Sequence, residues 1–284
     1  MIIYGTAKTI YELDITAAMR AGYPYEVLPN TTLNEKHDIN KTVKKVAGKY
    51  PTYKYLAIGV GGEDFIPENT GYSCSNHTGA DAALFEQIPF VLKPIGSDIT
   101  VAEQQHYRFK KRISVNGVEY YAYYLKCIDI VYEPGFYTLD TSITSQDTGE
   151  PSPIASFSTN TSELLNPVPF NRQLDRLDST ESRYIVKMIH TDFILTETEQ
   201  TYLEEVFKIL YPDPAVKTRN IRELAVCSGI DTHATDGNVE AAMVQVSFYY
   251  TVDIPFTLDM VQRNVYYRKI ELGGMEPLPV KQTT

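Results

Sequence analysis

The chain has 284 residues, a formal net charge of −10 and a sequence pI of about 5.0. This charge argues against a protein whose main role is to grip nucleic-acid phosphates, and the length suffices for one large domain or two smaller ones. Tryptophan is absent but tyrosine occurs 22 times, and tyrosine suits wetted sheet surfaces and interfaces because it joins contact area to a hydroxyl group.

The cysteines Cys74, Cys127 and Cys227 are odd in number and far apart, which indicates reduced thiols rather than a disulfide framework. The N-terminus lacks the basic and apolar regions of a secretory signal. No apolar run approaches the roughly 20 residues that cross a bilayer. We therefore expect a protein that is made in a cytoplasm and has no membrane role.

The N-terminal part reads as two helices followed by a strand. Residues 14–22 are predicted to form a short helix that Asp14 caps and Gly22 ends. A second helix is predicted over 34–48, from apolar residues at helical spacing, and a strand over 53–60.

The glycine-rich turn at 59–62 follows that strand, as a phosphate-binding loop would. The dinucleotide pattern needs glycine where Asp64 stands, and the neighbouring acids would repel phosphate, so a tight turn is favoured. Residues 71–75, Gly-Tyr-Ser-Cys-Ser, nearly match the nucleophile elbow, and Cys74 and His77 have a spacing found in metal sites. Neither pattern is complete, so we expect neither a covalent nucleophile nor a metal here.

Residues 107–132 carry the clearest local signal, two aromatic and β-branched runs joined by Asn116-Gly117. Asn-Gly favours a two-residue type I′ turn, because both positions need positive φ. The turn sets a register in which one face is mostly apolar and the other lays cations against tyrosine rings. That second face is either an ordinary solvated face or a surface buried against another subunit. Its candidate interface residues are Arg108, Lys110, Arg112, Tyr121 and Tyr123.

Residues 138–182 are rich in Ser, Thr, Asn, Asp and Pro and show neither helical nor strand periodicity. Such a segment is either a flexible linker or an arm that orders against neighbouring subunits. Scattered apolar residues favour the arm, because disordered tracts are poorer in them. The further interface candidates in this arm are Phe157, Leu164, Leu165 and Phe170.

The C-terminal part begins with a strand and then the strongest helix signal, over 196–211, where Thr196 and Glu199 form a capping box. A turn is predicted at Ser228-Gly229. A long strand is predicted over 239–254, with one apolar face and one polar face that meets water or a partner.

These patterns predict an α+β fold that is β-rich, with mainly antiparallel sheets, a few short helices and a long extended arm. The predicted organisation is an N-terminal α+β domain over 1–137, the arm over 138–182, and a C-terminal α+β domain over 183–284 whose tail leaves from about residue 273. No catalytic arrangement of His, Cys and acidic residues is recognisable, so we expect no enzymatic activity and no cofactor.

Three stretches resemble sequences of virion structural proteins from contractile-tailed bacteriophages: Asp81–Pro94 followed by the Asn-Gly hairpin, Ile221–Gly229, and Leu272–Pro279. The resemblance implies a virion subunit, made in the host cytoplasm, whose partners are copies of itself and other virion proteins. It favours a symmetric ring at the neck or collar, the head–tail connection, formed through sheet and arm contacts. The alternatives are a baseplate or tail subunit, or a receptor- or glycan-binding module. No functional residue carries over, and no direct nucleic-acid role is implied.

Overall fold

The computed structural model describes residues 2–28, 31–38, 48–66, 71–132, 135–144, 151–158, 175–178, 183–187, 189–212, 220–233, 239–255, 266–271, 274–277 and 280–283. The chain forms two compact units. Unit 1 comprises Met1–Ile128 and Ile194–Tyr266, and unit 2 comprises Asp129–Phe193 and Tyr267–Thr284.

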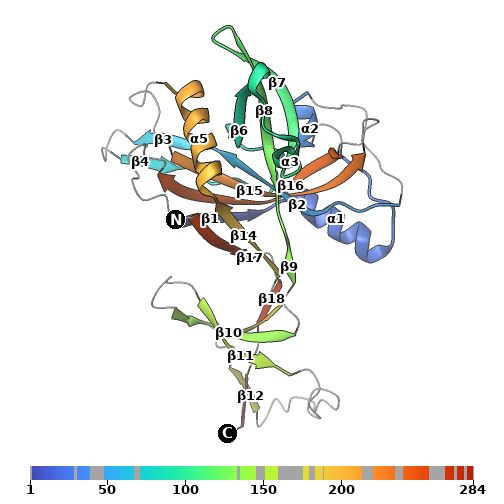
Figure 1. Cartoon of the computed structure of the whole chain (residues 1–284). Coiled ribbons are helices and arrows are strands. Elements are labelled where there is room, and N and C mark those ends of the chain that lie inside the picture. The colour runs from blue at the N-terminus through green and yellow to red at the C-terminus, as the bar shows by residue number, and fades with distance from the viewer. Residues whose placement is uncertain are drawn as a thin grey trace. The chain divides into compact units, whose positions relative to one another are not determined.

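Unit 1 is built on an eight-stranded antiparallel sheet (Figure 1). Its strands, in spatial order, are β1 (Ile2–Lys8), β16 (Val239–Pro255), β15 (Asn220–His233), β2 (Thr52–Gly59), β8 (Val118–Cys127) and β6 (Val91–Pro94), with β5 (Gln87–Ile88) on β2 and β7 (Tyr107–Val115) on β8. A separate two-stranded sheet pairs β3 (Glu63–Ile66) with β4 (Gly71–Cys74). The two longest strands described, β15 and β16, therefore lie inside the sheet, where β16 pairs with β1 and β15 pairs with β2.

The polar face predicted for β16 is not exposed. Gln245, Ser247, Tyr249 and Thr251 are all buried. Each of the first three has a partner inside the unit: Gln245 donates to Thr31 at 2.8 Å, the hydroxyls of Ser247 and Ser228 lie 2.7 Å apart, and Tyr249 donates to the Asp81 carbonyl at 3.1 Å. The prediction was wrong because alternation reveals which residues are polar but not which segments cover them. The turn predicted at Ser228-Gly229 is also wrong, since β15 continues through it with shifts of register.

The α-helices described in unit 1 begin at threonine caps. The helix α1 (Ile10–Ala21) starts at Thr9 rather than Asp14, and Gly22, with φ +70°, ends it as predicted. Thr9 accepts from the amide of Glu12 and donates to the Val246 carbonyl at 2.6 Å, so a contact with β16 fixes the start of the helix.

The other helices in the described part of unit 1 are α2 (Leu33–Lys36), η1 (Ile95–Ser97), α3 (Val101–Gln104) and α5 (Glu197–Leu210). The helix predicted over 34–48 is described only through residue 38 and again at residue 48, and its remainder lies outside the described residues. The capping box of Thr196 and Glu199 is present in α5, and the apolar side of α5 buries Leu203, Val206 and Phe207.

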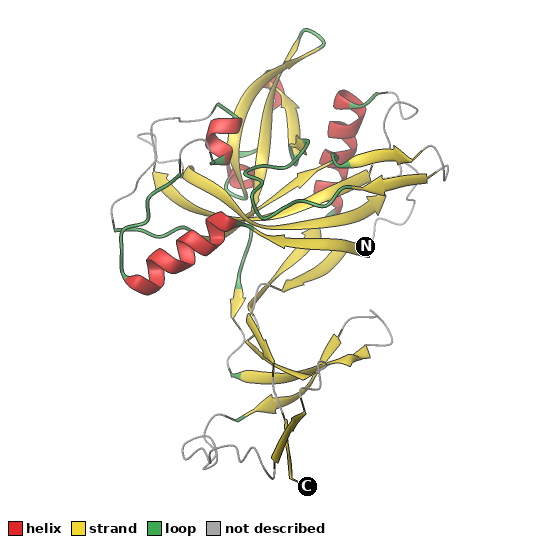
Figure 2. Ribbon diagram, turned by 180° about the vertical axis from the view of Figure 1, so that it is seen from behind, coloured by secondary structure: helices red, strands yellow, loops and turns green. Residues whose placement is uncertain are grey.

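The hairpin β7–β8 rises out of this sheet (Figures 1 and 2). Near its base, β8 pairs with β2 through Cys127 and Lys126. Closer to the turn, β8 pairs with the short strand β6 instead, and β7 pairs with β8. The base of the hairpin is therefore paired with β2, its outer part is paired with β6, and only the rows from Ser114 and Glu119 to the turn extend beyond β6.

Unit 2 consists of small antiparallel sheets. A four-stranded sheet has the order β11 (Pro151–Phe157), β10 (Phe136–Thr144), β13 (Arg183–Lys187) and β18 (Gly274–Pro277). A two-stranded sheet pairs β12 (Asp175–Asp178) with β19 (Val280–Thr283), and a three-stranded sheet has the order β17 (Tyr266–Glu271), β14 (Ile189–Leu195) and β9 (Val131–Tyr132).

The β-rich, mainly antiparallel α+β fold with a few short helices is confirmed. The observed division differs from the predicted boundaries at 137 and 183, because β15 and β16 complete the sheet that the N-terminal residues begin. The range 138–182 contains strands in its described parts, and the segment after 273 pairs with β13 and β12 instead of leaving the domain as a tail. Among the helices described, none combines the length and apolar character needed to cross a membrane.

Candidate functional site

The turn of the β7–β8 hairpin has the predicted geometry. Asn116 has φ +50° and Gly117 has φ +78°, as a type I′ turn requires. Val115 pairs with Val118, and the predicted register holds along the strands to the pair of Arg108 and Leu125. The local sequence therefore determined both the turn and the faces of the hairpin.

Three of the predicted interface residues lie on the accessible side of this hairpin. The Nζ atom of Lys110 is 4.0 Å from the centroid of the Tyr121 ring and 2.6 Å from Asp98 Oδ2. The Arg112 side chain is 66% exposed and its Nε donates to Glu119 at 2.6 Å. These cation–π and ion-pair contacts hold the side chains in place while leaving much of their surface accessible. We call Lys110, Arg112 and Tyr121 the hairpin face.

Tyr123 and Arg108 have a different role from the one predicted. Tyr123 is only 2% exposed, and its hydroxyl lies 2.9 and 3.0 Å from the two carboxylate oxygens of Asp98. The Arg108 side chain is mostly buried; its Nε lies 3.6 Å from Asp231 and its guanidinium donates to the Gln105 carbonyl at 2.8 Å. Both side chains hold the base of the hairpin within unit 1.

The other candidates belong to the predicted arm. Phe157 is the last residue of β11, and its side chain is not among those that the structure describes. Leu164, Leu165 and Phe170 lie outside the described residues.

A second polar centre, which sequence reasoning did not find, surrounds the carboxylate of Glu223 on β15. Glu223 is 2% exposed. Its Oε2 atom accepts hydrogen bonds from the backbone amides of Gly61, at 2.9 Å, and Glu86, at 3.1 Å. Its Oε1 atom accepts from the backbone amide of Phe85 at 2.6 Å and lies 2.8 Å from His77 Nε2. Both carboxylate oxygens of Glu223 are therefore hydrogen-bonded to backbone amides, as buried polar atoms in folded proteins usually are.

His77 occupies the middle of this centre. Its ring is stacked between Phe85 and Tyr249, with centroid distances of 4.0 and 3.9 Å. Its Nδ1 lies 3.1 Å from Asp81 Oδ2, so carboxylate oxygens face both ring nitrogens. Both ring nitrogens of His77 are therefore engaged inside unit 1.

Asp81 is set up as the second anion of the centre. Burial opposes its ionisation, but the hydrogen bonds from the amide and hydroxyl of Thr78, together with His77, outweigh burial and lower the pKa of Asp81. Lys36 adds a further cation: its ammonium group donates to the Leu84 carbonyl, and burial lowers its pKa while the field of Glu223 opposes that change. We call His77, Asp81 and Glu223 the histidine centre.

The glycines of the predicted tight turn make room for this centre. A Cβ atom at Gly59 would lie 2.3 Å from Glu223 Oε2, and one at Gly61 would lie 2.7 Å from the amide nitrogen of Glu86. Real Cβ atoms do not approach other atoms so closely. The glycine-rich turn therefore brings its backbone against a buried protein carboxylate, not against a phosphate.

In the histidine centre, the side chains of His77 and Glu223 are closed to solvent, at 1% and 3% exposed, whereas that of Asp81 is 30% exposed. Carboxylates occupy both nitrogens of His77, so neither is available as a metal ligand or as a base for a substrate. Within the described ranges, no group of three or more His, Cys, Asp or Glu residues is placed to hold a metal ion. The centre fastens loop 75–86 to β15 and β16.

Many tyrosines have internal partners in unit 1, which was not predicted. Tyr53 donates to Glu12 at 2.6 Å and Tyr211 donates to Glu86 at 2.6 Å. The other tyrosine–carboxylate pairs are Tyr55 with Asp231, Tyr107 with Glu199, Tyr123 with Asp98 and Tyr202 with Glu103. Burial and the bond to Glu103 raise the pKa of Tyr202 to about 12. Part of the high tyrosine content of the chain is therefore explained by packing inside unit 1, without contacts to another molecule.

A further surface feature lies on α1 and the residues after it. Ile10, Leu13, Met19, Tyr23 and Leu28 are large apolar residues with substantial exposure. A surface helix usually presents polar side chains to water, so exposed Ile10 and Leu13 on α1 are unusual.

Comparison with known proteins gives one finding about the whole chain. No curated protein and no solved structure matches it. The model of a family of unknown function, DUF7208, matches residues 3–284. The chain therefore belongs to the DUF7208 family.

Proposed function

We propose that this protein is a structural subunit of the virion of a contractile-tailed bacteriophage, and that it assembles as a symmetric ring at the neck or collar. Its partners are copies of itself and other virion proteins, and it works by the surfaces that it presents rather than by catalysis. The sequence resemblance given above suggests the type of particle, and the projecting hairpin supports a role in association.

The observation that carries the proposal is the distal half of the β7–β8 hairpin. It leaves β2 together with β6, its tip from Ser114 to Glu119 extends beyond β6, and Tyr123 and Arg108 fix its lower part. A projecting ribbon with a rigid base loses little conformational entropy when it binds, because its side chains are already ordered. The hairpin face offers cations and an aromatic ring, which are enriched at protein interfaces.

Charge supports contact between copies. The chain carries a net charge of −10, so most of its surface repels another copy, whereas on the hairpin face Lys110 and Arg112 are each balanced by one carboxylate, Asp98 and Glu119. This face therefore opposes the approach of an acidic neighbouring subunit less than the rest of the surface does. Such an interface depends on salt because the charges are only partly desolvated.

The experiment is a pair of charge-reversal variants in the phage that carries the gene. Arg112→Glu combined with Lys110→Glu should reduce incorporation of the subunit into purified particles by at least tenfold, as measured by quantitative mass spectrometry. Lys49→Glu changes the charge of an exposed loop residue away from the hairpin and serves as the control.

Normal incorporation of the double variant would refute the role of the hairpin face. Absence of the wild-type protein from purified particles would refute the virion proposal itself. Binding of the isolated protein to a glycan array, with loss of binding on mutation of the hairpin face, would favour the receptor- or glycan-binding alternative.

A further inference from the structure

The turn of the β7–β8 hairpin places an asparagine directly before a glycine at the surface. Asn116 and Gly117 are both exposed, and they form the only Asn-Gly pair in the sequence. Within the described residues, neither the Asn116 side chain nor the Gly117 amide has a hydrogen-bond partner. The carboxamide carbon of Asn116 and the backbone nitrogen of Gly117 are therefore close in the chain, and both are accessible to water.

The space around the turn admits a new ring. A Cβ atom at Gly117 would meet no heavy atom within 4 Å, so no neighbouring group lies against the turn there. Because glycine has no side chain, nothing shields its backbone nitrogen from the preceding side chain. A five-membered ring between the Asn116 side chain and the Gly117 nitrogen can therefore form without displacing other atoms.

The tip of the hairpin is held by few contacts, so it can open. Ring closure requires the asparagine backbone to rotate out of the turn conformation. The pairing of β8 with β6 ends at Tyr120, and beyond it the described backbone pairs are Ser114 with Glu119 and Val115 with Val118. A two-stranded ribbon is marginally stable by itself, and such segments open locally at low free energy. The turn can therefore reach the reactive conformation without unfolding of unit 1.

We propose that Asn116 is a site of spontaneous deamidation through a succinimide. The Gly117 nitrogen loses its proton to water and attacks Asn116 Cγ. The new N–Cγ bond replaces the Cγ–Nδ2 bond, and Nδ2 leaves as ammonia. Water then opens the ring: attack at Cγ gives aspartate, and attack at the backbone carbonyl carbon gives isoaspartate, whose main chain runs through Cγ. The reaction consumes water and ammonia leaves, with no oxidation or reduction.

Both products change the tip of the hairpin. Each adds a carboxylate to a turn that was neutral, and isoaspartate also adds one carbon atom to the main chain. The length and dihedral angles of a two-residue turn set the register of its strands, so the lengthened turn cannot close the pair of Val115 and Val118 in the same way. This inference does not rest on the virion proposal, because it concerns the chemistry of the isolated chain.

The test is peptide mapping of the purified full chain after incubation at pH 8.5 and 37 °C. Trypsin releases residues Ile113–Lys126, in which Asn116 is the only asparagine. Mass spectrometry detects the mass gain on conversion to either acid, and electron-transfer fragmentation distinguishes aspartate from isoaspartate. We expect Asn116 to convert at least tenfold faster than Asn34, with isoaspartate among the products.

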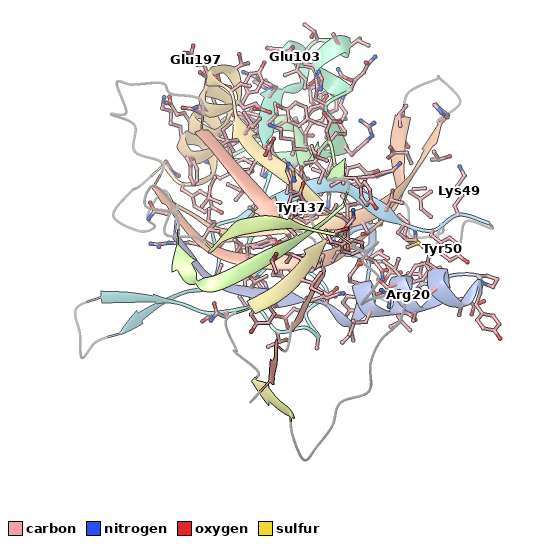
Figure 3. The ribbon with its side chains drawn as sticks, turned by 90° about the horizontal axis from the view of Figure 1, so that it is seen from below. Arg20, Lys49, Tyr50, Glu103, Tyr137 and Glu197 are labelled. Atoms are coloured by element: carbon pink, nitrogen blue, oxygen red, sulfur yellow. The ribbon has the colours of Figure 1, made fainter. Side chains whose placement is uncertain are left out.

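Asn34 is the control within the same chain. It is 2% exposed, its carboxamide donates to the carbonyls of Ala241 and Ala242, and it accepts from the amide of Val244. Trypsin releases it in the peptide that follows Arg20, whose side chain is labelled on α1 in Figure 3. A sample digested without incubation measures any conversion during digestion.

Asn116→Gly is the matched variant. Glycine accepts the positive φ of this turn position and has no carboxamide, so the variant should keep the turn and show no mass gain in this peptide. Conversion of wild-type Asn116 no faster than that of Asn34 would overturn the inference. Conversion to aspartate without isoaspartate would also overturn it, because direct hydrolysis of the side chain gives aspartate alone.

Discussion

His77 and Glu223 lie 146 positions apart in the chain, yet His77 Nε2 is 2.8 Å from Glu223 Oε1 in the interior of unit 1. This contact connects the loop after β4 with the central strand β15. Because the same carboxylate also accepts from the amides of Gly61, Phe85 and Glu86, it holds several irregular segments in one position. The Glu223 side chain thereby fixes the backbone at Gly61, Phe85 and Glu86, which lies outside the strands.

Replacing Glu223 with Gln should destabilise unit 1 by about 2 kcal/mol, a magnitude typical of leaving buried hydrogen-bond donors without an acceptor. Glutamine keeps the shape, but its NH₂ group cannot accept from the amides of Gly61 and Glu86, so donors would face donors. Urea unfolding monitored by far-ultraviolet circular dichroism measures the change.

Glu119→Gln is the control for this variant, since Glu119 pairs with Arg112 at the surface and its loss should leave the urea midpoint unchanged. Equal midpoints for Glu223→Gln and the wild type would show that the carboxylate is not the stabilising element of the centre.

Gly61→Ala should destabilise the protein by about 2 kcal/mol or more, whereas Gly96→Ala should be nearly neutral. A Cβ at Gly61 would lie 2.7 Å from both the Glu86 amide nitrogen and the Phe85 Cβ, so backbone would have to move, while a Cβ at Gly96 meets nothing within 4 Å. Thermal unfolding of the two variants side by side tests this. Similar melting temperatures for both variants would contradict the close packing around Glu223.

Local signals in the sequence predicted local structure well. Asn116-Gly117 specified the hairpin turn and its register, and Thr196 with Glu199 specified the start of α5, because each depends on residues close in the chain. The hairpin face was found in the same way. The contacts of Tyr123 and Arg108 were not predicted. Both residues were assigned to an interface, because their partners, Asp98 and Asp231, could not be inferred from spacing in the sequence.

The histidine centre could not be predicted for the same reason. The spacing of Cys74 and His77 drew attention to the right loop, but toward metal chemistry, and nothing local to Glu223 marks it as the partner of His77. The composition of the main sheet is also a long-range property: β15 and β16 add to the sheet begun by the N-terminal residues, and alternation within a strand does not specify its neighbours.

The buried tyrosines should make the protein unfold at high pH. Burial, the bond to Asp231 and its charge raise the pKa of Tyr55, and burial is also the largest cause for Tyr249. The unfolded state loses these protons near pH 10 while the folded state keeps them, so stability is fully present below about pH 10 and falls as the pH rises further. The upper limit is about 1.4 kcal/mol per pH unit for each such tyrosine.

Urea unfolding at a series of pH values between 8 and 11.5 measures this loss. Tyr55→Phe removes one titrating group and should make the decline above pH 10 shallower, although it lowers stability at neutral pH. An unchanged slope in Tyr55→Phe would mean that its hydroxyl ionises equally in the folded and unfolded states.

Assembly should protect the predicted arm. We expect a protease to cut between Thr138 and Ser182 in the free subunit and to spare this range in assembled particles, because the arm would then be covered by neighbours. Cleavage sites are identified by mass spectrometry of the fragments. Equal cleavage in both states would argue against an arm that packs on other subunits.

The central claim is that this protein acts by association within a virion, and an electron cryo-microscopy map of purified particles tests it most directly. We predict density for many symmetry-related copies in a ring at the neck or collar, with Lys110, Arg112 and Tyr121 buried between adjacent subunits. A map that accounts for every neck, tail and baseplate protein without this chain would contradict the claim.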